Sequence, residues 1–142
     1  MSLDRLRFVD SLQFLNSSLE TLVDNVVKSG SELSVLKQCF GEHLDLLVRK
    51  GVYPYEYASS FDRFAETSLP AREHFVSGLR ESPASDEDYA HARLVWSAFA
   101  MRTFGDYHDH YLLLDTVWLA QVFELFRDMK LRDYRMDPCH FY

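Results

Sequence analysis

The sequence of 142 residues has only two cysteines and fewer basic than acidic side chains. Cys39 and Cys139 lie far apart and outside any Cys-x-x-Cys spacing, so we expect free thiols in a reducing compartment. The 15 basic and 22 acidic residues give a formal net charge of −7. This charge argues against a stand-alone nucleic-acid-binding module, because such a module normally carries a basic patch.

Long apolar runs are also missing from the chain. The longest fall far short of a membrane span and the N-terminus has no secretory pattern, so we expect an intracellular protein without membrane contact. No glycine-rich phosphate loop, zinc-binding spacing or Ser/His/Asp arrangement is present. No repeat or long linker divides the chain, and 47% apolar residues can build the core of a single domain.

The longest periodic stretch runs from Thr103 to Met129 and predicts a helix. Thr103 and Asp106 have capping-box spacing, and apart from Gly105 no glycine or proline interrupts the chain before Pro138. At about 100° per residue, one apolar face is formed by Phe104, Tyr107, Tyr111, Leu114, Trp118, Val122, Leu125 and Met129.

Asp115 falls near the middle of this predicted apolar face. It follows Tyr111 by one helical turn, and His108 lies at the edge of the same stripe. An ionised carboxylate against a core is costly unless it is paired, hydrogen-bonded or bound to a metal. Asp115 is therefore a candidate functional residue. A partly exposed acid, or one hydrogen-bonded to the helix backbone, is the alternative.

The rest of the sequence predicts a mostly α-helical chain with one or a few short strands. Leu6 to Val9 has the composition of a strand, and it has no evident partner within the chain. Apolar spacing and capping residues predict further helices at 17–28, 33–40, 44–48, 59–67 and 85–99. Gly30 and Gly41 are expected to end the first two of these helices.

Three smaller features have alternative interpretations. The tyrosine-rich turn from Gly51 to Tyr57 either packs onto the core or stacks unpaired bases. His108 and His110 point about 200° apart on a helix, so they cannot bind one ion together, and we expect solvated or edge-packed rings. Asp10 follows the predicted strand, where it is expected to cap a turn rather than to act in catalysis.

Tyr111-x-x-x-Asp115 on a helix resembles the third exonuclease motif of family B DNA polymerases. A longer match extends the resemblance to the protein-primed family B polymerases of Polinton/Maverick-type transposons and related viruses. The similarity runs from about Leu6 to Tyr142. The segments that carry it are Leu6 to Ser11, Lys50 to Tyr57, Gly105 to Asp115 and Leu119 to Arg127.

This resemblance implies an incomplete RNase H-like α/β domain of the proofreading 3′→5′ exonuclease type. The family's first two exonuclease motifs, Asp-x-Glu and Asn-x-x-Phe/Tyr-Asp, do not occur before Tyr111. Residues 1–142 are therefore expected to be the C-terminal part of that domain, truncated at both ends. By resemblance, Asp115 would ligate one of two Mg²⁺ or Mn²⁺ ions, and Tyr111 would position the attacking water.

The resemblance also implies the partners and location of the parent polymerase. These are the single-stranded primer end of DNA, a terminal protein primer, and the nucleus, a viral replication site or otherwise the cytoplasm. The isolated chain is expected to be inactive and to self-associate through its unpaired strand. The alternative is a small acidic helical interaction protein, derived from a transposon and without catalytic activity.

Overall fold

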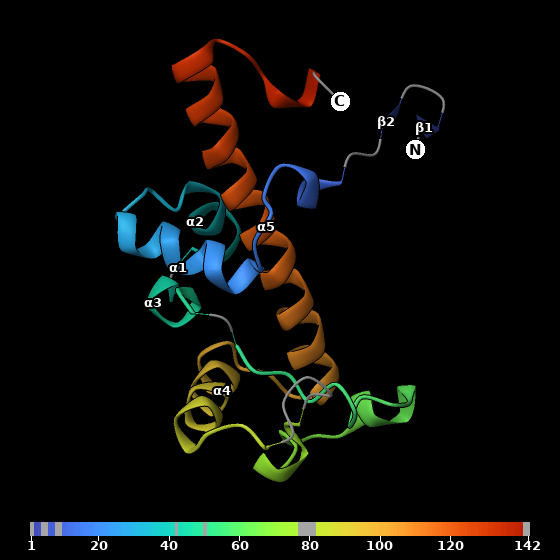
Figure 1. The fold of residues 1–142 in the computed structure, drawn as a ribbon. Coiled ribbons are helices and arrows are strands. Elements are labelled where there is room, and N and C mark those ends of the chain that lie inside the picture. Colours follow the sequence, from blue (N-terminus) through green and yellow to red (C-terminus); the bar gives the residue numbers. More distant parts are fainter. Residues whose placement is uncertain are drawn as a thin grey trace.

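A computed structural model describes residues 2–3, 6–7, 10–41, 43–49, 51–76 and 82–140 (Figure 1). The elements are β1 (Ser2–Leu3), β2 (Leu6–Arg7), η1 (Ser11–Gln13), α1 (Leu19–Ser29), α2 (Ser34–Phe40), α3 (Leu44–Leu47), η2 (Phe61–Ala65), η3 (Arg72–His74), α4 (Asp86–Ala98), α5 (Phe104–Tyr134) and η4 (Pro138–His140), where η marks 3₁₀ helices. The prediction of a mostly α-helical chain with short strands is confirmed.

The other helices are arranged around the long helix α5. In Figure 1, α1 and α2 lie beside its middle, and α4 lies near its N-terminal end. Two apolar clusters share this helix: one surrounds Phe104 and Tyr107, and the other surrounds Leu114, Trp118 and Val122. All five of these side chains are buried, at the spacing that the sequence predicts. One face of α5 therefore forms the centre of both clusters.

Local sequence explains where the helices begin and end. The Thr103 hydroxyl accepts the amide of Asp106 at 3.2 Å and the Asp106 carboxylate accepts that of Thr103 at 3.0 Å, which completes the predicted capping box. Helix α1 ends at Gly30, whose φ of 64° suits a residue without a side chain. It begins two residues later than predicted, because Ser18 is the N-cap and accepts the Thr21 amide.

Helix α2 lacks a capping side chain of its own and takes one from α5. Its N-cap residue, Leu33, makes no side-chain cap. The buried Gln121 carboxamide oxygen accepts the amide of Val35 at 2.9 Å and that of Leu36 at 3.4 Å. The Gln121 amide group also donates to the Glu32 carbonyl at 3.3 Å. The first turn of α2 therefore depends on a residue more than eighty positions away.

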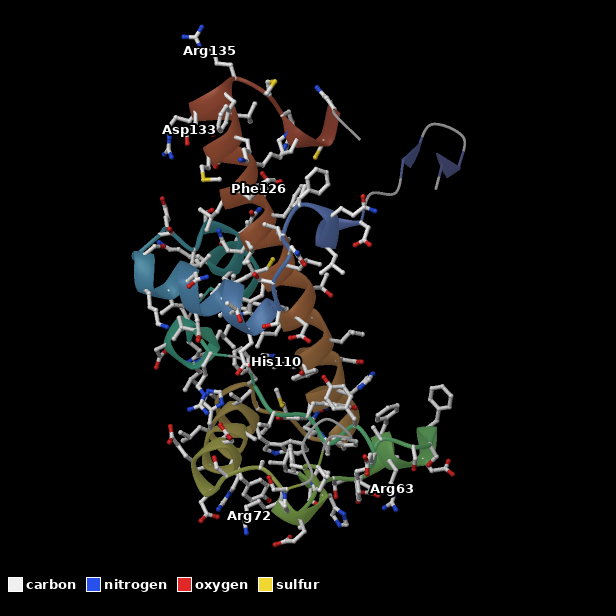
Figure 2. All side chains as sticks on the ribbon, viewed as in Figure 1. Arg63, Arg72, His110, Phe126, Asp133 and Arg135 are labelled. Carbon is white, nitrogen blue, oxygen red and sulfur yellow. The ribbon has the colours of Figure 1, made fainter. Side chains whose placement is uncertain are left out.

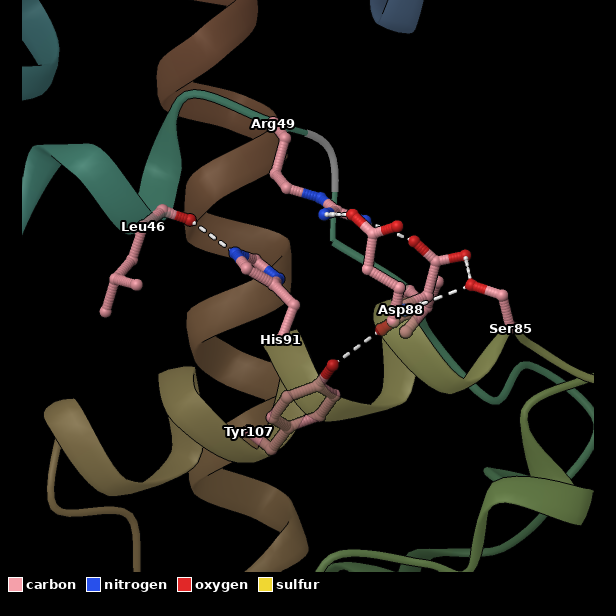
Figure 3. Close-up of polar contacts among 8 residues, drawn as sticks. Leu46, Arg49, Ser85, Asp88, His91 and Tyr107 are labelled. Atoms are coloured by element: carbon pink, nitrogen blue, oxygen red, sulfur yellow. Dashed lines mark hydrogen bonds and ion pairs between the residues drawn. The ribbon is translucent and has the colours of Figure 1, made fainter.

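The segment after α2 is fixed from two sides. The indole nitrogen of Trp118 donates to the Leu47 carbonyl at 2.8 Å, which joins the end of α3 to α5. Two positions later, Arg49 forms ion pairs with Glu87 and Asp88 in the first turn of α4 (Figure 3). The short piece of chain between α3 and the tyrosine-rich turn is thereby held between two helices.

The predicted strand has a partner, which corrects the expectation that it would be unpaired. Strand β2 pairs antiparallel with β1, with Ser2 opposite Arg7 and Leu3 opposite Leu6. Two residues are too few for a strand pattern to be recognised in sequence, which is why β1 was not expected. Residues 8–9 of the predicted strand lie outside the described residues. The outer edges of this two-stranded sheet have no further strand beside them in the described residues, so self-association stays a prediction.

The structure also tests three smaller predictions from the sequence. Asp10 caps η1 by accepting the Leu12 amide at 3.0 Å, as predicted. Both cysteines, Cys39 and Cys139, are free. The helix expected at 59–67 is instead a five-residue 3₁₀ helix. None of the helices in the described ranges is long and apolar enough to cross a membrane.

The Gln121 cap gives a stability prediction. Gln121→Leu keeps a similar side-chain volume but leaves the buried Val35 and Leu36 amides without their acceptor. We expect the free energy of unfolding to fall by about 1–3 kcal/mol. Urea unfolding followed by circular dichroism measures it. Gln38→Leu, at an exposed position of α2, is the control and should change stability little. Equal losses in both variants would contradict the capping role.

Candidate functional site

Tyr111 and Asp115, the two residues singled out by sequence, lie one turn apart on α5. Tyr111 is half-buried, and Asp115 is partly exposed rather than covered by the core. The acid thus lies at the edge of the apolar face and not at its centre, because residues of the next turn rather than Asp115 fill the core. The two side chains interact: the negative charge of Asp115 contributes to a raised pKa of Tyr111.

The tyrosine-rich turn packs directly against this pair. The ring of Tyr53 stacks on that of Tyr111 with centroids 4.8 Å apart, and the hydroxyls of Tyr55 and Tyr111 are 2.9 Å apart. The Tyr53 hydroxyl also hydrogen-bonds Nδ1 of His108 at 2.6 Å, and the other side of the imidazole stacks on Phe64. Packing of the turn onto the core is confirmed for Tyr53, which is 8% exposed, whereas Tyr55 is 53% exposed.

Backbone contacts hold the turn in this position. The Tyr107 hydroxyl donates to the carbonyl of Val52 at 2.6 Å (Figure 3). The carbonyl of Pro54 accepts the amides of Tyr57 and Ala58, both at 3.1 Å. The turn is therefore fixed at its start by α5 and closed on itself around the proline, which leaves little freedom for its aromatic rings.

Burial raises the pKa of two hydroxyl groups in this cluster. It raises the pKa of Tyr53 to about 12, with a smaller contribution from the neighbouring Tyr55. The pKa of Tyr111 is raised mainly by burial, then by its hydrogen bond with Tyr55 and by the charge of Asp115. Tyr53 and Tyr111 are neutral at pH 7, as a free tyrosine also is, so their hydroxyls can donate hydrogen bonds.

Two histidines beside this cluster were not predicted to share a cavity. His110 lies against the rings of Phe99 and Phe40, with centroids 4.3 and 5.6 Å away (Figure 2). Its Nε2 is buried and has no hydrogen-bond partner among the described residues, and burial lowers its pKa to about 4. His91 hydrogen-bonds the Leu46 carbonyl at 2.9 Å (Figure 3). Both rings line a cavity of about 20 Å³.

The predicted separation of His108 and His110 is confirmed, since the two rings have different neighbours. Within the described ranges, no three His, Cys, Asp or Glu side chains are grouped so that they could hold a metal ion. Among the described residues Asp115 is therefore not part of such a group, and one carboxylate does not make a Mg²⁺ or Mn²⁺ site. No metal-dependent step follows from these residues alone.

Comparisons of the chain with models of known protein families, with curated proteins and with solved structures find no match. Assignment of a function therefore depends on the residues and their geometry.

The buried His110 gives a prediction for the pH dependence of stability. The pKa of His110 is about 4 in the folded chain and about 6.5 in the unfolded chain. Between these two pH values the imidazole is protonated in the unfolded state but largely neutral in the folded state, so protonation favours unfolding. Stability should be greatest above pH 6.5 and fall as the pH is lowered towards 4. The lowered pKa of His91, also caused by burial, acts in the same direction.

Urea unfolding at pH 7.5, 6.5 and 5.5 measures this loss. His110→Phe keeps an aromatic ring between Phe40 and Phe99 and should reduce the pH dependence clearly. His140→Phe, at an exposed position, is the control and should leave it as in the unmodified chain. A His110→Phe chain with an unchanged pH dependence would show that the loss originates elsewhere.

Proposed function

We propose that residues 1–142 contribute the Tyr111–Asp115 element to a metal-dependent 3′→5′ exonuclease centre of a protein-primed family B DNA polymerase. The chain would be the helical part of an RNase H-like domain. The remaining metal-binding carboxylates would come from polypeptide outside these residues. The complete polymerase would bind the single-stranded end of a DNA primer. A terminal protein would also be a partner, as the group that primes DNA synthesis.

One observation carries this proposal. Two of the segments that resemble the family, 50–57 and 105–115, are about fifty residues apart in sequence, yet their described residues meet in space. Tyr55 and Tyr111 share a hydrogen bond of 2.9 Å, and Tyr53 stacks on Tyr111 at 4.8 Å. A resemblance due to chance would give no reason for its separate segments to form one cluster around the candidate residues.

The chemistry of the two residues is compatible with these roles. The Asp115 carboxylate is partly exposed, so it can be reached by a cation that other carboxylates also bind. In a complete centre, divalent metals activate water and stabilise the leaving oxygen. The Tyr111 hydroxyl stays protonated and lies one turn away, where it would orient a water molecule by hydrogen bonding. The exposed ring of Tyr55 is available to stack a base.

The first test uses the chain alone. Because no three potential metal ligands are grouped in the described residues, we expect no metal-dependent shortening of a labelled single-stranded oligonucleotide. Mn²⁺ should bind weakly, with NMR line broadening that centres on Asp115 and is lost in Asp115→Asn. Nuclease activity of the pure chain that disappears in Asp115→Asn would mean that the centre is complete and that the proposal misplaces its other ligands.

The second test places the variants in a complete polymerase that contains this segment. Asp115→Ala should lower excision of a mismatched primer end by orders of magnitude while matched-primer extension continues, since only a metal ligand of the exonuclease is removed. Tyr111→Phe should cost less, because it deletes one hydroxyl and keeps the stacked ring. His108→Ala should cost least.

Tyr55→Phe is the matched control for Tyr111→Phe. It breaks the same Tyr55–Tyr111 hydrogen bond but leaves the Tyr111 hydroxyl in place. If both variants lose the same excision activity, the shared hydrogen bond matters and Tyr111 has no separate role. Equal loss of excision and extension in Asp115→Ala would make Asp115 a structural residue.

A further inference from the structure

The face of α5 that points away from the core is unusually apolar. Exposed residues recur there at helical spacing: Asp109, Leu112, Leu113, Thr116, Leu119 and Ala120. Three of them, Leu112, Leu113 and Leu119, are 59%, 50% and 39% exposed, and we call these three the leucine face. The solvent side of a helix is normally charged or polar. Grouped exposed leucines are instead typical of an interaction site.

Along α5, the charged residues next to the leucine face have one sign. Between Thr103 and Phe126 the sequence contains no lysine or arginine. Asp109 precedes Leu112 by three positions, and Asp115 follows Leu112 by three, so both acids border the leucine face. Any surface that covers the leucines must also approach these carboxylates.

An interface of the usual size on the leucine face must also cover Asp109 and Asp115. A specific protein–protein contact covers about 800 Å² on each partner, which is more than three partly exposed leucines supply. The contact must therefore extend over the bordering acids. Taking carboxylates out of water is costly unless the partner supplies positive charge. An apolar centre with a basic rim is the surface that complements this face.

The same charges disfavour other occupants. Two copies of the leucine face would bring the acids of one against the acids of the other. Phosphate groups of nucleic acid and the anionic surface of a membrane would be repelled in the same way.

We propose that the leucine face is a docking surface for another protein whose contact surface is apolar at its centre and carries lysine or arginine at its rim. This proposal stands without the nuclease assignment, because it uses only the exposure of the leucines and the sign of the charges around them.

A synthetic helical peptide with leucine along one face and lysine elsewhere serves as the probe. Its binding to the full chain is measured by fluorescence anisotropy at low and high salt. We expect binding that weakens with salt, and a loss of at least tenfold in the Leu112→Gln/Leu113→Gln double variant, because two leucines leave the contact. Asp109→Asn should weaken binding less and reduce the salt dependence.

Controls separate this site from general attraction between a basic peptide and an acidic chain. Leu94 on α4 is 58% exposed, so Leu94→Gln removes an equally exposed leucine elsewhere and should leave binding unchanged. A scrambled peptide of the same composition and a glutamate analogue of the probe should bind far more weakly. Binding that survives the double variant, or that either control peptide matches, would overturn the proposal.

Sedimentation of the chain alone tests the competing occupant. We expect a monomer at micromolar concentration. A dimer that dissociates in Leu112→Gln/Leu113→Gln would mean that a second copy covers the leucine face, which overturns the proposal of a basic protein partner. Neither measurement involves nuclease activity, so failure here leaves the proposed function unaffected.

Discussion

Trp118 and Gln121 lie three positions apart on α5, and each donates a hydrogen bond to the backbone of an earlier part of the chain. Both side chains are nearly inaccessible to water, so their polar groups must be satisfied inside the protein. The Leu47 carbonyl and the first amides of α2 meet this need. Helix α2 and the end of α3 thus obtain part of their hydrogen bonding from α5, and α5 obtains its buried partners from them.

In the N-terminal half of α5, tyrosine side chains likewise contact the backbone and rings of an earlier segment. The Tyr107 hydroxyl fixes the carbonyl of Val52, and the adjacent Tyr53 ring then lies against Tyr107 and Tyr111. Because Tyr107 is almost completely buried, its position along α5 determines where the turn from Gly51 to Tyr57 can settle. The candidate site is consequently part of the core packing, and Tyr111 cannot move without disturbing the turn.

The sequence predicts features that depend on neighbouring residues. The capping box at Thr103 and the helix end at Gly30 each need only a few adjacent positions, and both occur as predicted. The apolar stripe of α5 is buried at five of its eight predicted positions, whereas Met129 at its end is exposed. Contacts between distant residues could not be predicted. The Gln121 cap of α2 and the hydrogen bond between Tyr55 and Tyr111 join positions that no local pattern connects.

The exposure of Asp115 in the candidate site also depends on distant residues and could not be predicted from local sequence. Periodicity places it on the apolar face, but only the packing of α1, α2 and α3 determines which part of that face is covered. The covered part ends beside Asp115, so the acid is partly exposed. An ideal helical angle predicts the direction of a side chain and not the extent of the neighbouring elements.

Asp115 therefore lies where the covered face of α5 meets the leucine face. A protein that docks on Leu112 and Leu119 removes water from the acids at this border, and that cost is part of its binding free energy. Positive charge brought by the partner lowers the cost, whatever contacts the carboxylates already make within the chain. Docking on the leucine face and charge neutralisation near Asp115 are thus thermodynamically coupled, so each favours the other.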